Sequence, residues 1–592
     1  MENKRAIIFG ASNLGNIAYN VLKYKYQICY FSDNDKQKWG KSFNGLEIIE
    51  PSKLYKFNNK DFKIIIASIY YGEISNQLQN IGFKEIYNFC YCDPNDRTYK
   101  KRYSVDKIHD YRIYDDIMLD EKFKTRFRNN FNLIYNINDN YCKNKNISAT
   151  KKVLIVSYIF PPIGGGGVQR TLKFVKYLRE YGWEPIVLTV GNDFGYDNKD
   201  NSLIDDIPED INIIRIDHNI FNSEQLNKNL IKEFINLIYG VVDDKYIMNE
   251  YLYYIQDNNC SNRNSIFIPD ICVGWVNNVL KNIVNIINFN DISLVYTSSS
   301  PYSDHIIGYY LKRKYNIPWV ADFRDEWTNH AYYSEEYSKI PIEYKINRKM
   351  EENIVNLSDA ILTVTPICVQ NYINNFNLEK NKVILITNGY DESDFSKLEH
   401  VKNDKFTLIF NGSLYKEINP LNIILSINQL IDDHKINVNN LQVRLIGTIT
   451  INIKTLLYEN DKYNIIKYCG YLSHNLSLRM ASSADILLLI LGESEKVKSV
   501  YTGKLFEYLR LYKPILALSP KGSLVDQLLN VTKSGKNFEY DDINGIKEYI
   551  LNQYRNWKDG IKKFYPNKNE IEKYERKNLT KELAKVFNDL IN

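Results

Sequence analysis

Short apolar runs of strand length recur along the chain in three series, and segments with helical patterning separate most of them. Parallel strands need long crossover connections, which are usually helices, so this alternation predicts α/β domains with parallel sheets. A chain of 592 residues is also too long for one hydrophobic core, and about three domains are expected. The expected strands are 6–9, 27–31, 63–68, 151–160, 184–190, 293–299, 318–323, 360–365, 382–387, 406–412, 443–447, 486–491 and 514–519.

The three series predict a small Rossmann-like domain followed by two tandem Rossmann-like lobes. A polar stretch rich in Asn, Asp, Lys and Tyr interrupts the alternation and is typical of a linker. Open α/β sheets bind ligands at the carboxyl ends of their strands, so the two lobes predict a binding cleft between them. The expected division is 1–95 (nucleotide-binding type), 96–150 (linker), 151–395 (first lobe), 396–566 (second lobe) and 567–592 (C-terminal helix).

Composition excludes few functions, but it bears on the partners and the cellular compartment of the protein. The 76 basic and 71 acidic residues leave a net charge of +5, which does not indicate a nucleic-acid partner. The eight cysteines are scattered without zinc-ligand spacing, which favours a reduced, cytoplasmic protein. We expect no signal peptide, because the charged start leads directly into a strand, and no apolar run reaches the roughly 18 residues of a membrane span. Peripheral association with the inner face of the cell membrane stays open.

A glycine-rich loop lies at the predicted turn after the first strand of the first lobe. The stretch 160–170 has two prolines and then Gly164, Gly165, Gly166 and Gly167 before a helix. Glycines there allow close backbone approach, and the helix N-terminus offers free N–H groups to an anion or a hydroxyl. The Lys-Ser/Thr pair of a P-loop is absent. A ligand-binding loop and a plain flexible turn are both open interpretations.

A second candidate site opens a predicted helix in the stretch 500–518. Thr502 is a potential N-cap, and the first turn carries Gly503, Lys504 and Glu507. Backbone N–H groups and a lysine ammonium suit the diphosphate of a nucleotide, and Glu507 can accept hydrogen bonds from ribose hydroxyls. The pattern therefore predicts a nucleotide-binding helix start.

Two further segments add charged or small residues at strand ends. In the stretch 410–420, Gly412 and Ser413 follow a strand, and Lys416 is the nearest cation, either a phosphate ligand or a solvated loop lysine. In the stretch 320–327, Arg324 and Asp325 lie beside a strand end. They are interpreted either as acceptor-positioning groups or as part of a structural ion-pair cluster.

Together these segments, over roughly residues 151–565, resemble family 4 glycosyltransferases of the branch that builds bacterial surface polysaccharides. The resemblance implies a GT-B fold and a metal-independent, cofactor-free transfer with retained anomeric configuration. It implies a UDP- or GDP-sugar donor and a glycan or lipid-linked glycan acceptor, with the glycine loop facing the acceptor and the donor diphosphate. Lys504 and Lys416 would then act on the leaving phosphate, and Arg324 and Asp325 on the acceptor.

Two positions depart from that family's pattern. The family has two glutamates separated by seven residues; Glu507 matches the second, but Ser499 stands in place of the first. Ser413 stands where relatives often have an arginine. Because the missing glutamate normally contacts the donor sugar, a catalytically weak scaffold that binds a nucleotide sugar or a partner is the alternative to an active transferase.

The N-terminal series carries an incomplete dinucleotide fingerprint. Gly10 and Gly15 occupy two of its positions, Ser12 replaces the middle glycine, and Asp33 ends the second strand where a ribose-binding acid would lie. The stretch 31–54 resembles a small Rossmann-like module attached to bacterial sugar-modifying enzymes. Ligand sensing or partner interaction is one interpretation, and binding of a nucleotide or NAD(P), with the chain a sugar-modifying NAD(P)-dependent enzyme, is the other.

Overall fold

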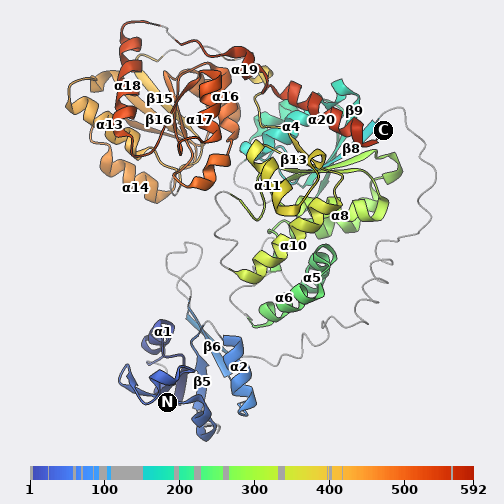
Figure 1. Ribbon diagram of the computed structural model, residues 1–592, viewed down its shortest axis with the longest axis vertical. Coiled ribbons are helices and arrows are strands. Elements are labelled where there is room, and N and C mark those ends of the chain that lie inside the picture. Colours follow the sequence, from blue (N-terminus) through green and yellow to red (C-terminus); the bar gives the residue numbers. More distant parts are fainter. Residues whose placement is uncertain are drawn as a thin grey trace. The chain divides into compact units, whose positions relative to one another are not determined.

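The computed structural model divides the chain into two compact units, Met1–Phe131 with Asp244–Ile266 and Asn132–Asp243 with Phe267–Asn592. Figure 1 shows their elements, and each unit is described by itself below. The residues that the structure describes are 5–23, 26–57, 62–68, 71–83, 86–91, 103–107, 151–191, 199–218, 228–257, 266–330, 340–396, 398, 403–415, 418–561 and 564–591.

The first unit is built on one sheet with the strand order β3-β4-β2-β1-β5-β6-β7. Strands β4, β2, β1, β5 and β6 are parallel, and antiparallel β3 and β7 flank them. Strand β7 lies within the expected linker 96–150, so the sheet continues beyond residue 95; the rest of that linker lies outside the described residues. The elements are β1 (Arg5–Phe9), α1 (Asn13–Leu22), β2 (Gln27–Ser32), β3 (Ser42–Phe43), β4 (Leu46–Ile49), β5 (Phe62–Ile66), α2 (Tyr71–Asn80), β6 (Ile86–Tyr91), β7 (Tyr103–Lys107) and α6 (Lys245–Asp257).

The second unit begins with a seven-stranded parallel sheet in the order β10-β9-β8-β11-β12-β13-β14. Its strands are β8 (Lys151–Val156), β9 (Trp183–Val190), β10 (Asn212–Ile216), β11 (Leu294–Ser299), β12 (Trp319–Phe323), β13 (Ala360–Thr363) and β14 (Val383–Leu385). Its helices are α4 (Gly166–Leu178), α5 (Lys228–Val242), α7 (Val273–Asn282), α8 (Ser303–Tyr315), α10 (Pro341–Leu357), α11 (Pro366–Phe376) and α12 (Glu392–Phe395).

A six-stranded parallel sheet follows in the same unit, in the order β17-β16-β15-β18-β19-β20. Its strands are β15 (Phe406–Asn411), β16 (Leu441–Ile446), β17 (Ile466–Gly470), β18 (Ile486–Ile490), β19 (Ile515–Leu518) and β20 (Gly535–Phe538). Its helices are α13 (Leu421–Asp432), α14 (Ile451–Asn460), α15 (His474–Ser482), α16 (Gly503–Leu511), α17 (Leu524–Thr532) and α18 (Ile543–Lys558), and α19 (Lys568–Glu572) and α20 (Arg576–Ile591) end the chain.

These strand orders confirm the expected fold class. In each sheet of the second unit, the chain runs outward from a central strand to one edge and then returns to the other side of that strand, which is the doubly wound Rossmann order. The order reverses at β8 in the first lobe and at β15 in the second. The protein therefore has the α/β GT-B architecture of two tandem Rossmann-like lobes, preceded by a small Rossmann-like domain.

The last helix belongs to the core of the first lobe rather than to that of the second. The buried side chains of Leu579, Leu583 and Phe587 pack with the residues of β8 and α4. The Phe587 ring meets the Trp183 ring edge-on, with centroids 5.2 Å apart. Figure 1 shows α20 beside α4 of the first lobe, although in the chain α20 follows the second lobe. The chain thus crosses from the second lobe back to the first.

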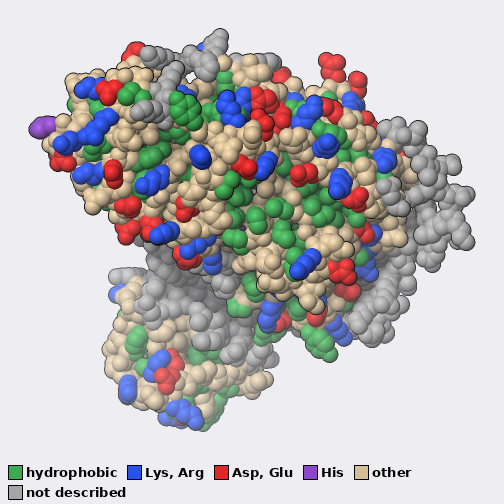
Figure 2. Space-filling model, turned by 45° about the horizontal axis from the view of Figure 1, so that its top comes forward, with side chains coloured by type: hydrophobic (Ala, Val, Ile, Leu, Met, Phe, Trp, Pro, Cys, Tyr) green, Lys and Arg blue, Asp and Glu red, His purple; other side chains and the backbone are tan. Residues whose placement is uncertain are grey.

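The described surface mixes charges of both signs. Figure 2 shows lysine, arginine and acidic side chains interspersed over the face that it presents, in keeping with the small net charge of +5. Among the helices that the structure describes, none combines the length and the apolar character that a bilayer crossing requires.

Candidate functional site

A cavity of about 270 Å³ lies at the points where the two strand orders reverse. The first lobe contributes the loop after β8, and the second contributes the turn after β15 and the start of α16. Crevices at such reversal points are where open α/β sheets bind ligands. The predicted site residues that line it are Gly165, Gly166, Gly412, Ser413, Gly503, Lys504 and Glu507.

Lys504 brings a cation into this cavity with no anionic partner among the described residues. Its Nζ lies 4.7 Å from the centre of the Phe410 ring and close against Gly412. A Cβ at position 412 would come within 1.8 Å of that Nζ, and the backbone there has φ of +146°, so only glycine leaves room for the ammonium. Burial lowers the pKa of Lys504 to about 8, although Glu507 opposes the shift. A bound anion would supply the missing partner.

The helix α16 begins where the sequence predicts, with Thr502 at the N-cap position. The Thr502 side chain makes no capping hydrogen bond, however, and its buried Oγ1 has no partner among the described residues. The first N–H groups of α16 therefore stay available at the cavity, where Gly503 lies without a side chain in the way. The positive end of the helix dipole adds to the charge of Lys504.

Glu507 is held by a residue that sequence reasoning missed. Its Oε1 lies 2.8 Å from Nε2 of His474, at the first position of α15. Burial opposes charge on both groups, but their mutual attraction prevails, so the pKa of His474 rises to about 9 and that of Glu507 falls. The backbone N–H of His474 also donates to Asp200 of the first lobe at 2.8 Å. His474 is one of only seven histidines, and that was the available signal.

The glycine loop is divided between the cavity and the lobe interior. Gly165, with φ of +103°, is the N-cap residue of α4, and nothing lies within 4 Å of a Cβ built at Gly166. A Cβ at Gly167 would instead meet Nη1 of Arg324 at 2.7 Å. Gly165 and Gly166 line the cavity, whereas Gly164 and Gly167 do not. Gly166 therefore faces open space that a ligand can use.

Arg324 and Asp325 do not line the cavity. The guanidinium of Arg324 donates to the carbonyl oxygens of Gly167, Ser299 and Ser300, at 2.5 Å for both serines. Arg324 therefore stabilises the start of α4 through the backbone of the glycine loop. Asp325 is exposed. The alternative reading of this segment as structural fits the contacts of Arg324 better than acceptor binding does.

The segment after β15 is described only in part. Ser413 lines the cavity, and its hydroxyl lies 2.8 Å from that of Thr448. Lys416 lies outside the described residues. Ser499, which stands in place of the family's first glutamate, bonds to the carbonyl oxygen of Lys496 at 2.9 Å and is not among the cavity residues.

A second missed residue reaches the cavity from the C-terminal helix. Arg576 begins α20, is only 3% exposed and lines the cavity. Its Nη1 is buried without a hydrogen-bond partner among the described residues. Burial, reinforced by Arg170, lowers its pKa to about 9. Nothing in the local sequence pattern of the tail indicates that it reaches a site 70 residues away in the chain.

Comparisons with known proteins give a family match for the N-terminal part alone. Residues 2–87 match the family described as C2185-like, N-terminal. No curated protein matches the chain.

Solved structures of similar shape cover about three quarters of the chain. A glycosyltransferase from Rickettsia africae ESF-5 is 13% identical and covers 75% of this chain and 100% of its own, with a TM-score of 0.45. Anabaena Alr3699/HepE in complex with UDP and glucose is 13% identical over 74% of this chain and 100% of its own, with a TM-score of 0.43. The N-terminal domain of Candida albicans trehalose-6-phosphate phosphatase is 11% identical over 76% and 98%, with a TM-score of 0.49.

In the N-terminal unit, Asp33 bonds to the loop that follows β1. Asp33 accepts hydrogen bonds from the backbone N–H of Ala11 at 2.8 Å and from Lys38 at 3.1 Å. A Cβ at Gly15 would lie 1.8 Å from the carbonyl oxygen of Gly10, so the helix and strand pack as closely as the third fingerprint glycine permits. Ser12 is the N-cap residue of α1 but makes no side-chain capping bond. The acid expected at a ribose thus holds the loop itself, and NAD(P) binding gains no support.

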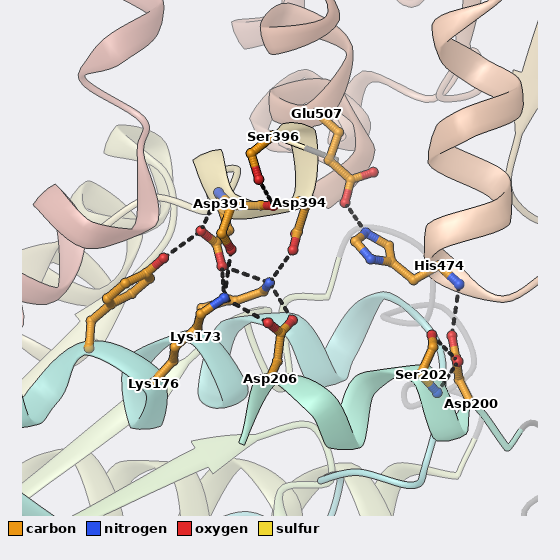
Figure 3. A network of polar contacts seen from close by, with 12 residues as sticks. Lys173, Lys176, Asp200, Ser202, Asp206, Asp391, Asp394, Ser396, His474 and Glu507 are labelled. Carbon is orange, nitrogen blue, oxygen red and sulfur yellow. Dashed lines mark hydrogen bonds and ion pairs between the residues drawn. The ribbon is translucent and has the colours of Figure 1, made fainter. Parts of the chain in front are cut away.

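A buried ion cluster ties α4 to the segment after β14. Figure 3 shows Lys173 and Lys176 of α4 directed at Asp206, Asp391 and Asp394. The Lys173 ammonium lies 2.7 Å from all three acids and the Lys176 ammonium 2.6 and 2.8 Å from two of them. These acids could bring ligand atoms within 4.8 Å of one another, but the two ammonium groups already pair with all three. Burial opposes the charge of Lys173, yet the acids outweigh it and raise its pKa.

Proposed function

We propose that this protein is a retaining glycosyltransferase that moves a sugar from a nucleotide sugar to a glycan or lipid-linked glycan in cell-surface polysaccharide biosynthesis. The observation that carries the proposal is the cavity between the lobes. It combines the open glycine Gly166 of the first lobe with Lys504, Glu507 and the uncapped start of α16 from the second. A cation without an ion-pair partner and a helix start without a side-chain cap, as the described residues show them, suit a diphosphate, and the glycine loop leaves room for a second substrate.

The proposed reaction breaks the bond between the anomeric carbon and the leaving diphosphate. The acceptor hydroxyl attacks that carbon on the face from which the diphosphate leaves, and its proton passes to a phosphate oxygen. Positive charge develops on the sugar ring and negative charge on the phosphate. Lys504 and the α16 dipole would stabilise the phosphate charge, which is the largest contribution that such a preorganised site offers. No side-chain nucleophile is required.

A nucleotide-sugar-binding scaffold without turnover is the second candidate. Ser499 at the position of the expected glutamate favours it, because the contact to the donor sugar would be missing. The N-terminal unit would then be the sensing or docking part of such a scaffold. Binding without hydrolysis or transfer separates this candidate from the transferase.

The test is a thermal-shift screen of the purified chain against UDP- and GDP-sugars, followed by a turnover assay. We expect at least one nucleotide sugar to raise the midpoint and to be hydrolysed slowly when no acceptor is present. Proton NMR of the product made with an acceptor would show whether the new glycosidic bond keeps the anomeric configuration of the donor. If the protein binds nucleotide sugars but turns over none of them, the transferase proposal fails and the non-catalytic scaffold is the function that remains.

A further inference from the structure

The C-terminal helix places in the cavity an arginine that has no ion-pair partner among the described residues. Arg576 has 3% of its surface exposed, and its Nη1 finds no partner among the described residues. The side chain lines the same cavity as Lys504 and Glu507. Glu507 attracts it, but that carboxylate is already bonded to His474 at 2.8 Å. The guanidinium therefore lies in the cavity wall, and its Nη1 can donate hydrogen bonds to a ligand.

A buried arginine in this position lowers stability unless something else compensates for it. Buried charges are normally paired, because removing a guanidinium from water costs several kcal/mol. The first lobe contains a buried arginine with a structural role, and its charge is fully paired. Arg170 is 1% exposed, and its guanidinium binds both oxygens of Asp322 at 2.7 and 3.0 Å and the carbonyl oxygen of Thr387 at 2.8 Å. Arg576 has no such carboxylate among the residues that the structure describes, so a ligand is the candidate for its missing partner.

We propose that Arg576 binds a phosphate group of the ligand in this cavity, so that helix α20 completes the donor site. The inference rests on the proposed function for the identity of the ligand as a nucleoside diphosphate sugar. The neighbouring groups point to an anion of this kind. Lys504 has no acidic partner among the described residues, and α4 and α16 both open towards the cavity without side-chain caps.

This assignment predicts opposite effects on stability and on binding. Arg576→Gln removes a buried charge without a partner, so the unliganded protein should melt at a higher temperature than wild type. The same change should weaken binding of a phosphate ligand about 10- to 100-fold, as expected for a hydrogen bond to a charged group. A residue that only supports the fold would lower the melting temperature instead.

The experiment uses the full chain and isothermal titration with UDP, GDP and inorganic pyrophosphate. Lys577→Gln is the matched control, because Lys577 is the next residue of α20 and is half exposed, pairing with Glu180 at 2.7 Å. We expect Arg576→Gln to weaken all ligands that wild type binds, Arg576→Lys to retain part of the affinity, and Lys577→Gln to bind as wild type does. Unchanged affinity of Arg576→Gln, or no binding of any of the three by wild type, would overturn the proposal.

The outcome also separates this inference from the proposed function. If pyrophosphate binding is lost in Arg576→Gln while wild type transfers no sugar, Arg576 is a phosphate-binding residue and the transferase proposal fails. If wild type transfers sugar while Arg576→Gln binds as tightly as wild type, the transferase stands and Arg576 has no part in the donor site.

Discussion

At the scale of single residues, Lys504 is the group on which the proposed chemistry most depends. We expect Lys504→Ala to reduce sugar transfer about 10²- to 10³-fold, because it removes one preorganised charge stabiliser. Lys498→Ala is the control, since Lys498 pairs with Glu495 at 2.6 Å and does not line the cavity. Steady-state kinetics with both variants checks this. Turnover of Lys504→Ala within about threefold of wild type would place the donor elsewhere.

The lowered pKa of Lys504 gives a second residue-scale prediction. Below pH 8 the ammonium is charged and can pair with a diphosphate, and above pH 8 it loses its proton in the unliganded protein. Affinity for UDP or GDP should therefore fall as the pH rises from 7 to 9.5. His474, with a pKa raised to about 9, titrates at the upper end of this range. In Lys504→Met the part of the fall near pH 8 should vanish; titrations at several pH values would show whether it persists.

Substitutions at Gly166 and Gly167 should distinguish a loss of ligand binding from a loss of stability. Gly166→Val should abolish turnover with little change in melting temperature, because its Cβ meets nothing within 4 Å. Gly167→Val should lower the melting temperature, since its Cβ would meet Arg324 at 2.7 Å. Differential scanning fluorimetry and activity on both variants make the comparison. Loss of stability in Gly166→Val would mean that the loop is only a structural turn.

At the scale of elements, the ion cluster holds α4 to the connection between the lobes. Lys173 is 1% exposed and contacts three acids, and Lys176 pairs with only two of them, so Lys173→Met should leave Asp394 without a cation and cost about 3–5 kcal/mol. Lys176→Met is the matched change on the same helix, and it should cost less because Lys176 is 19% exposed. Urea unfolding of the two variants at pH 7 would reveal this order. Midpoints of both variants equal to that of wild type would show that the cluster adds little stability.

At the scale of the whole molecule, the N-terminal segment of the first unit, Met1–Phe131, should be separable from the rest of the chain, which keeps Asp244–Ile266. Among the described residues, its hydrophobic clusters lie between Ala6 and Ile86, and those of the two lobes begin at Val153. A chain that starts at Ser148 should fold and bind the same nucleotide as the full chain within about threefold. It should lose acceptor choice, regulation or partner binding instead. An insoluble or non-binding short chain would show that the N-terminal unit completes the transferase fold.

The central strands could be predicted from the sequence, because they are buried on both faces and therefore consist of continuous apolar runs. Strands β8, β11, β15 and β18 lie within a few residues of their predicted bounds, and α16 starts at Gly503 after Thr502 as expected. The local chemistry of that helix start also brought Lys504 and Glu507 into the predicted site. Such features depend on neighbours in the chain, and a pattern can record them.

The sheet edges and the contacts across the cleft depend on tertiary packing and could not be predicted from local patterns. Strands β10, β17 and β20 were not predicted, because an edge strand is half exposed and needs no continuous apolar run. The contact of His474 with Glu507 and the return of α20 to the first lobe join segments that are far apart in sequence. Arg576 reaches the cavity because Leu579, Leu583 and Phe587 are buried in the core of the other lobe. Periodicity can show that this helix has an apolar face, but which lobe buries it depends on the packing of the whole chain.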